Sequence, residues 1–345
     1  MRLGITLGYS GGDIREKVAL AQEAERLGFE MCWTSEAWGT DAISPAAWIL
    51  AQTSRIKVGT AIVQMQSRSP ALAAMTAMTL QDMSGGRFVL GIGPSGPQVI
   101  EGWHGVPFGK PLARTREYIS IIRQILRRDG VLEHHGEHYD IPYNGPGATG
   151  LGKPLKTILH PDPELTIYTA AITPAGVRTA AEVADGVIPV FMDPESDVFE
   201  GPITDGLDKA ANGKTAADFE VVPFVPIRVG SDLEACRAPV REHLAFYVGG
   251  MGARDKNFYN DYVQRMGYED EARKVQDLFL SGQRKEATAA LPDELVDSVA
   301  LLGDKARIHD RLGAWKDAVA AGRVAAIAVT GATPEAIRVL AEAAA

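Results

Sequence analysis

Short apolar runs, rich in valine and isoleucine, recur along the chain and predict strands. Most intervals between them carry apolar residues at the spacing of one helix face. In residues 56–97, two such runs flank a helix. Ser69-Pro70 opens that helix, because proline at the first helical position loses no intrahelical bond, and Gly85-Gly86 ends it. The predicted strands are residues 2–7, 30–35, 56–63, 87–93, 165–172, 186–191, 221–229 and 324–330.

This alternation favours a parallel α/β fold. Eight strands and about 250 residues are typical of a (β/α)8 TIM barrel, and the chain has 345 residues. Two segments account for the excess. Residues 129–163 are rich in Gly, Pro and His, and residues 246–300 lie in a stretch, 233–322, that is predicted to be almost entirely helical. We therefore expect one barrel domain over residues 1–345 with these two insertions; a doubly wound open sheet is the alternative.

Ligands of parallel α/β folds bind at the carboxyl ends of the strands, the end of the barrel that we call the mouth. Glu36 follows the second predicted strand, with Trp38 beside it. A carboxylate next to an indole can exchange a proton with a substrate, so Glu36 is the candidate catalytic residue. A salt bridge to a loop arginine such as Arg254 is an equally weighted structural alternative. Other candidates that follow strands are Gln64, Gln66, Ser95, Gly96, Gln98, Glu101, Trp103, His104 and Thr173.

The segment Gly91-x-Gly93-x-x-Gly96 matches a dinucleotide-binding fingerprint. Pro94 and Pro97 lack the backbone N–H groups that such a loop directs at a pyrophosphate. The acidic residue expected about 20 positions later, at the end of a strand, is also missing. We therefore reject a Rossmann interpretation.

Three histidines, His134, His135 and His138, lie close together in a hairpin-like segment. Neighbours in a strand face opposite sides, so a solvated hairpin is preferred to a metal site. The chain has no nucleophile elbow, P-loop or HExxH motif, which leaves hydrolase and phosphoryl-transfer functions without support.

The composition of the chain limits the classes of binding partner. The chain has 35 Lys and Arg against 44 Asp and Glu, a net charge of −9, which argues against nucleic acid and anionic membranes. No apolar run is long enough to span a membrane and the first ten residues do not resemble a signal peptide. Cys32 and Cys236 lie in no motif, as expected of reduced thiols. We expect a cytoplasmic protein that acts on a small molecule; a homo-oligomer is left open.

The run from Tyr247 to Arg254, YVGGMGAR, reads either as a tight loop or as a structural turn between helices. In the first case, Arg254, Asn257 and Tyr259 would reach the mouth.

Several motifs, in this order and spacing, resemble the luciferase-like monooxygenase superfamily: Gly59-Thr60-Ala61-Ile62, Ser69-Pro70, Ser84-Gly85-Gly86-Arg87-Phe88, Gly91-Ile92-Gly93 and Ala184-Asp185-Gly186. Three further segments resemble its branch of coenzyme F420-dependent oxidoreductases: Arg114-Thr115-Arg116-Glu117-Tyr118, the run 247–254 and Asn257-Phe258-Tyr259. Ser35-Glu36 stands where the sugar-phosphate dehydrogenases of that branch carry Asp-His, so a sugar-phosphate substrate is disfavoured.

The resemblance implies a barrel whose mouth holds a deazaflavin or flavin, and a non-prolyl cis peptide between Ala61 and Ile62 that supports its ring. The implied function is hydride transfer between the deazaflavin C5 and an organic substrate. An FMN-dependent monooxygenase subunit and a non-catalytic flavin-binding protein are the alternatives. The cofactor-binding residues expected are Ala61, Ile62, Gln64, Ser95, Gly96, Ala171, Thr173 and Gly176.

The cofactor phosphate is expected at residues 171–176, because a helix that begins near Pro174 offers free N–H groups to an anion. The donors would be Thr173, Ala175, Gly176 and Val177, and Arg178 could assist. The acidic tail of F420 would suit a basic exit made by Lys110, Arg114 or Arg116, and FMN needs no such exit. F420 is therefore favoured over FMN.

Overall fold

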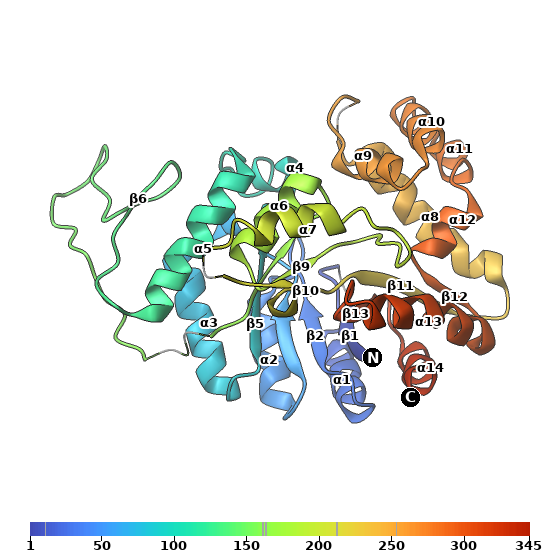
Figure 1. Ribbon diagram of the computed structural model, residues 1–345, viewed down its shortest axis with the longest axis horizontal. Helices are drawn as coiled ribbons and strands as arrows, with labels where there is room; N and C mark the ends of the chain where they lie inside the picture. Colours follow the sequence, from blue (N-terminus) through green and yellow to red (C-terminus); the bar gives the residue numbers. More distant parts are fainter. Residues whose placement is uncertain (11, 161, 163, 212, 253) are drawn as a thin grey trace.

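The chain folds into a closed parallel barrel, as a computed structural model shows for all residues except 11, 161, 163, 212 and 253 (Figure 1). Strand β10 pairs with β9, β11 pairs with β13, and β1 pairs with both β13 and β2, so the ring closes. Each of these pairings is parallel. Within the described residues the ring has eight strand positions: β1 (Arg2–Thr6), β2 (Met31–Thr34), β3 (Lys57–Thr60), β5 (Phe88–Gly93), β8 (Ile167–Ala170), β9 (Gly186–Ile188), β10 with β11 (Glu220–Val221 and Phe224–Val229), and β13 (Ala326–Thr330).

The predicted barrel is thus confirmed, and the open-sheet alternative is wrong. Two further parallel segments adjoin the ring: β4 (Val63–Gln64) pairs with β5, and β12 (Leu301–Gly303) pairs with β11. The prediction that residues 233–322 are almost entirely helical is wrong, because β12 interrupts them.

The helices begin where local capping signals place them. Asp13 accepts a hydrogen bond from the Arg15 N–H at 2.8 Å, and Ser69 from the Leu72 N–H at 3.1 Å. Gly85 ends its helix at φ 64°, a left-handed conformation that glycine adopts without strain. The helices next to the barrel are α1 (Ile14–Arg26), α2 (Ile43–Gln52), α3 (Pro70–Ser84), α5 (Pro111–Arg127), α6 (Pro174–Val183), α7 (Glu200–Leu207), α13 (Lys305–Ala320) and α14 (Pro334–Ala344). Short turns are η1 (Met65–Ser67), α4 (Pro97–Ile100) and η2 (Ala216–Asp218).

Two groups of elements lie outside this regular repeat. A small hairpin of β6 (His134–His135) and β7 (Asp140–Ile141) belongs to a long excursion between α5 and β8 (Figure 1). A cluster of helices between β11 and β12 comprises α8 (Leu233–Gly250), α9 (Phe258–Arg265), α10 (Glu269–Leu280), α11 (Arg284–Ala289) and α12 (Asp293–Ser298). The division into one domain with insertions at 129–163 and 246–300 stays a prediction. Pro161 and Pro163, in the first of these segments, and Ala253, in the second, lie outside the described residues.

Two apolar clusters hold the fold together. The larger one lies between the sheet and the helices. The smaller one fills the inside of the barrel and consists of Met31, Trp33, Val89, Tyr168, Ile188, Val222, Ala326 and Ala328. Trp33 is fully buried there, and a Cβ at Gly59 would lie 2.3 Å from its ring. Glycine at position 59 therefore lets the indole cross the barrel.

Cys32 and Cys236 are both buried and unpaired. None of the helices among the described residues combines the length and apolar composition needed to span a bilayer.

Candidate active site at the barrel mouth

Glu36, which follows β2, lies in a buried ion pair with Arg68. The side chains are 6% and 18% exposed, and the carboxylate also accepts hydrogen bonds from the N–H groups of Ala42 at 3.0 Å and Gln64 at 3.2 Å. Both guanidinium nitrogens of Arg68 donate to it. The choice of Arg254 as the ion-pair partner of Glu36 was wrong, because Arg254 pairs with Asp277 on the surface. Glu36 thus joins the loops after β2 and β3.

The peptide bond between Ala61 and Ile62 is cis, in agreement with the prediction. The Ala61 N–H donates to the Thr34 carbonyl at 2.6 Å, which holds the turn against β2. The Ile62 side chain reaches β5, where a Cβ at Gly93 would lie 2.6 Å from its Cδ1 atom. Glycine at position 93 therefore allows the two loops to approach each other.

Gln64 is 1% exposed and connects two loops of the mouth. Its amide nitrogen donates to the Ala37 carbonyl at 3.2 Å, so its oxygen faces His104 Nε2 at 3.1 Å and accepts from it. These two partners hold the Gln64 side chain in place, and its role in binding the cofactor stays a prediction. His104 is left with Nδ1 as the ring nitrogen for proton exchange.

Ser95 and Gly96 form the turn after β5. Ser95 has φ 57° and Gly96 is the N-cap residue of α4. The neighbouring Trp103 is 66% exposed. The role of Ser95 and Gly96 in binding the cofactor stays a prediction.

The predicted phosphate segment, 171–176, includes the N-cap and the first turn of α6, as expected. Thr173 caps this helix: its hydroxyl accepts from the Gly176 N–H at 3.1 Å, and its carbonyl accepts from the Val177 N–H at 2.9 Å. Two of the four proposed donors are therefore occupied within the helix. Arg178, which could assist, pairs with Asp205 on the surface, and its role stays a prediction.

A cation that the sequence analysis missed lies beside this segment. Arg265, near the end of α9, donates to the carbonyl of Ile172 at 3.0 Å. The same helix is held over the mouth by Tyr262, whose hydroxyl donates to the Phe191 carbonyl at 3.1 Å. Arg265 is separated from Ile172 by 93 positions, so no local signal could have found it.

The basic exit predicted for an acidic tail is partly neutralised. Lys110 pairs with Glu137, and Arg116 pairs with Glu182. Arg114 lies over the ring of Tyr139, 5.8 Å from its centroid. Of the three cations, Arg114 is the one for which no ion pair is found among the described residues.

The run 247–254 follows the helix–helix alternative. Tyr247 to Gly250 are the last turn of α8, and a Cβ at Gly249 would lie 2.5 Å from Phe279 on α10. Asn257 caps α9 and donates to the carbonyl of Val248, so its side chain does not reach the mouth. Tyr259 packs with Tyr247 at a centroid distance of 4.6 Å, and both rings also lie against Phe191, which follows β9 at the mouth.

The histidine-rich segment forms the hairpin of β6 and β7, as its sequence predicts. His134 contacts Glu117 at 3.1 Å, and His135 contacts Asp140 at 2.6 Å. Among the described residues, no group of three or more His, Cys, Asp or Glu side chains is placed to hold a metal ion.

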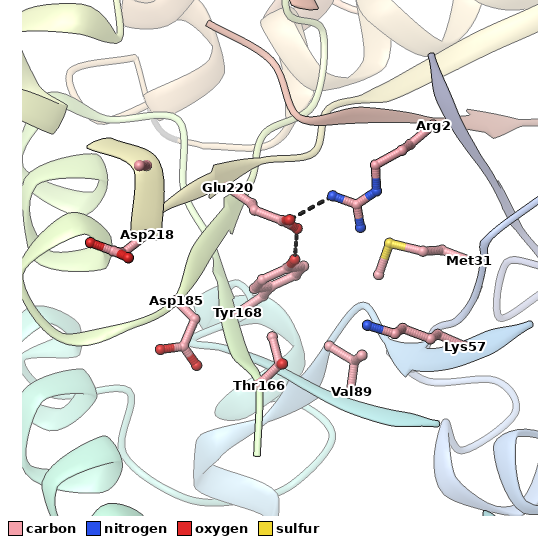
Figure 2. A pocket seen from close by; sticks show the side chains of 10 residues that line it. Arg2, Met31, Lys57, Val89, Thr166, Tyr168, Asp185, Asp218 and Glu220 are labelled. Atoms are coloured by element: carbon pink, nitrogen blue, oxygen red, sulfur yellow. Dashed lines mark hydrogen bonds and ion pairs between the residues drawn. The ribbon is translucent and has the colours of Figure 1, made fainter. Parts of the chain in front are cut away.

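A cavity of about 200 Å³ lies at the opposite end of the barrel. Figure 2 shows the Glu220 carboxylate there, between the guanidinium of Arg2 and the hydroxyl of Tyr168. Most of the lining residues lie at or just before the amino ends of strands. In TIM barrels that end serves stability, whereas chemistry takes place at the carboxyl ends. We therefore place the active site at the mouth.

A closed parallel barrel with its polar loops at the carboxyl ends defines a ligand-binding α/β barrel. The family model of luciferase-like monooxygenases matches residues 1–322, and the chain belongs to this family.

A Mycobacterium tuberculosis protein described as a candidate coenzyme F420-dependent oxidoreductase is 41% identical over 99% of this chain and 98% of its own length. A 5,10-methylenetetrahydromethanopterin reductase of Archaeoglobus fulgidus is 29% identical over 84% of this chain and 82% of its own. The fold is also that of the F420-dependent tetrahydromethanopterin reductase of Methanopyrus kandleri: the TM-score is 0.79 at 21% identity, over 99% of this chain and 97% of the other.

Proposed function

We propose that this protein is a coenzyme F420-dependent oxidoreductase that moves a hydride between C5 of the deazaflavin and a small organic substrate. The observation that carries the proposal is the 41% identity, over nearly the whole chain, to a relative described with that cofactor and reaction class. The bound deazaflavin supplies the redox chemistry, and the protein binds it, orients it and excludes water.

The phosphate of the cofactor fits between α6 and α9. Arg265 uses one nitrogen for the Ile172 carbonyl, and its other N–H groups remain for an anion. The Thr173 hydroxyl and the N–H of Ala175 lie at the start of α6, where the helix dipole favours negative charge. This donor set replaces the one expected from the sequence, with Arg265 as the added cation.

The deazaflavin ring would lie across the mouth, against the loops that carry Ala61, Ile62, Ser95 and Gly96. This placement comes from the family resemblance and from the position of these loops at the carboxyl ends of β3 and β5.

Proton handling is better suited to His104 than to Glu36. The Glu36 oxygens accept four hydrogen bonds, two of them from Arg68, so they are committed as acceptors. The His104 ring is held at Nε2 by Gln64 and can exchange a proton at Nδ1. Glu36 then acts by positioning the loops after β2 and β3.

The test is a titration of the purified protein with oxidised F420 and, separately, with FMN, followed by the change in cofactor fluorescence. We expect F420 to bind and FMN to bind at least about tenfold more weakly. Arg265→Met should weaken F420 binding roughly tenfold, as loss of a charged hydrogen-bond donor to the phosphate would. The matched control is Arg254→Met, because the Arg254–Asp277 pair is exposed at 60% and 59%.

Micromolar binding of FMN without binding of F420 would overturn the assignment in favour of the monooxygenase subunit. Binding of F420 without oxidation or reduction by any substrate would favour a non-catalytic binding protein. A cytoplasmic location remains part of the proposal, supported by the two unpaired cysteines.

A further inference from the structure

Six ring side chains gather on one side of the mouth, and we call them the aromatic surface: Tyr9, Trp38, Phe191, His243, Tyr247 and Tyr259. Four of these rings, Phe191, His243, Tyr247 and Tyr259, contact one another. Tyr247 lies 4.6 Å from Tyr259, 4.7 Å from His243 and 5.5 Å from Phe191, all between centroids. Tyr9 and Trp38 form a second pair at 5.5 Å.

The two groups of rings come from different parts of the fold. Tyr9, Trp38 and Phe191 follow the carboxyl ends of β1, β2 and β9. Tyr247 and Tyr259 belong to α8 and α9. The phenol of Tyr9 acts electrostatically on both Tyr247 and Tyr259, so it lies near them. The helices of the second insertion therefore bring their rings to the loops of the mouth.

The six side chains of the aromatic surface include no Lys, Arg, Asp or Glu, and the Lys17 ammonium beside Tyr9 donates to the Gly8 carbonyl at 3.4 Å. Burial raises the pKa of Tyr247 to about 12 and also raises that of Tyr9, while it lowers the pKa of His243. Besides burial, the Tyr9 phenol raises the pKa of Tyr247, and the phenols of Tyr247 and Tyr9 raise that of Tyr259. The one nearby arginine that the sequence suggested, Arg254, is paired with Asp277.

Its polar groups are still available. Within the described part of the chain, the hydroxyls of Tyr247 and Tyr259 have no hydrogen-bond partner. Neither hydroxyl oxygen is fully buried. They can therefore donate a hydrogen bond to an oxygen atom of a ligand. A surface with flat apolar faces and a few hydroxyl groups at its edge is typical of small-molecule sites.

We propose that the aromatic surface is the substrate subsite and that it selects an uncharged molecule with an aromatic or cyclic hydrocarbon body and one polar oxygen. This inference rests on the proposed function, and it adds the substrate class. Ring stacking favours such a body, whereas a carboxylate or phosphate would lose water here without gaining a cationic partner.

The experiment compares two probes that share a ring and a ketone. Acetophenone is uncharged, and benzoylformate carries a carboxylate in place of the methyl group. Binding of each to the F420-loaded protein is measured by calorimetry. We expect acetophenone to bind at least about tenfold more tightly than benzoylformate, because the subsite offers no cation. Tighter or equal binding of benzoylformate overturns the proposal.

Substitutions in the aromatic surface test whether acetophenone binds there. Tyr247→Leu should weaken acetophenone binding roughly two- to tenfold, the range that loss of one stacking ring gives. Phe258→Leu is the matched control, because Phe258 is an exposed ring on α9 with no ring contact among the described residues. If Tyr247→Leu does not fold, Trp38→Ala replaces it, since Trp38 is 53% exposed. Equal affinities of the tested variant and the control overturn the proposal.

A parallel F420 titration of the same samples separates the two hypotheses. Binding of F420 without binding of acetophenone overturns the substrate class and leaves the proposed function intact. Failure of F420 to bind overturns the proposed function, and the assignment of the aromatic surface to a substrate falls with it.

Discussion

Replacing Glu36 by glutamine should destabilise the fold more than any surface substitution of the same kind. In the native protein the carboxylate is 6% exposed and accepts from Arg68 and from two backbone N–H groups. Glu36→Gln keeps the shape of the side chain but turns one acceptor oxygen into an NH2 donor. That group then faces donors, and Arg68, 18% exposed, loses its counter-ion.

The cost follows from these contacts. Removing one partner of a buried ion pair costs about 3–5 kcal/mol, because the other charge is left uncompensated. The amide retains part of the hydrogen bonding, so we expect about 3 kcal/mol. For a chain of this length, each kcal/mol lowers the melting temperature by roughly 2 °C, which gives a decrease of about 6 °C.

The assay is thermal unfolding of the wild type, Glu36→Gln, Arg68→Met and the double variant. The double variant should be more stable than the sum of the single effects predicts, by at least about 2 kcal/mol. Asp277→Asn is the control, since its exposed pair with Arg254 is worth at most about 1 kcal/mol. An unchanged melting temperature in Glu36→Gln, with reduced turnover once a substrate is known, would refute this reasoning and restore the proton-transfer role.

Three further changes test the packing and its pH dependence. Gly91→Ala should lower stability by roughly 3 kcal/mol, because the new Cβ would lie 1.8 Å from the Thr60 carbonyl oxygen; Gly313→Ala, in open space, should slightly raise the melting temperature. Tyr168→Phe should lower the free energy of unfolding, measured by urea denaturation, by about 1–2 kcal/mol, since Glu220 loses a hydrogen-bond donor. An unchanged free energy of unfolding would show that water replaces the phenol.

Burial lowers the pKa of His243 in the folded protein below its usual 6.5. As the pH falls below 6.5, the His243 imidazole is therefore protonated more readily in the unfolded chain than in the folded one, and acid reduces the stability of the fold. The melting temperature of His243→Phe should therefore rise relative to that of the wild type as the pH falls from about 7 to about 5. Parallel curves of melting temperature against pH would contradict this.

The sequence located the strands and the helix starts because their signals are local. A cap such as Ser69 bonds a residue three positions away, and a proline at the first helical position acts on its own turn. The stripe of α5, which includes Tyr118, Ile122 and Leu126, is buried as its spacing predicted. By contrast, β12 is only three residues long and is fixed by its pairing with β11, so its neighbourhood in the chain gave no strand signal.

The residues around the site were harder to predict, and the reason is chain separation. Glu36 could be recognised as a candidate, but the choice of Arg68 over Arg254 depends on the turn after β3. Arg265 reaches Ile172 across 93 positions, because α9 is docked over the mouth by Tyr262.

The sequence by itself therefore determined the class of fold, the family and the strand ends at which a ligand binds, since apolar periodicity, caps and short motifs act within a few residues. Only the tertiary structure decided which polar groups are already paired and which rings gather at the mouth. Tyr9, Phe191 and Tyr259 come from three distant segments. Contacts between such segments depend on how helices pack against the barrel, and no local pattern of residues encodes that packing.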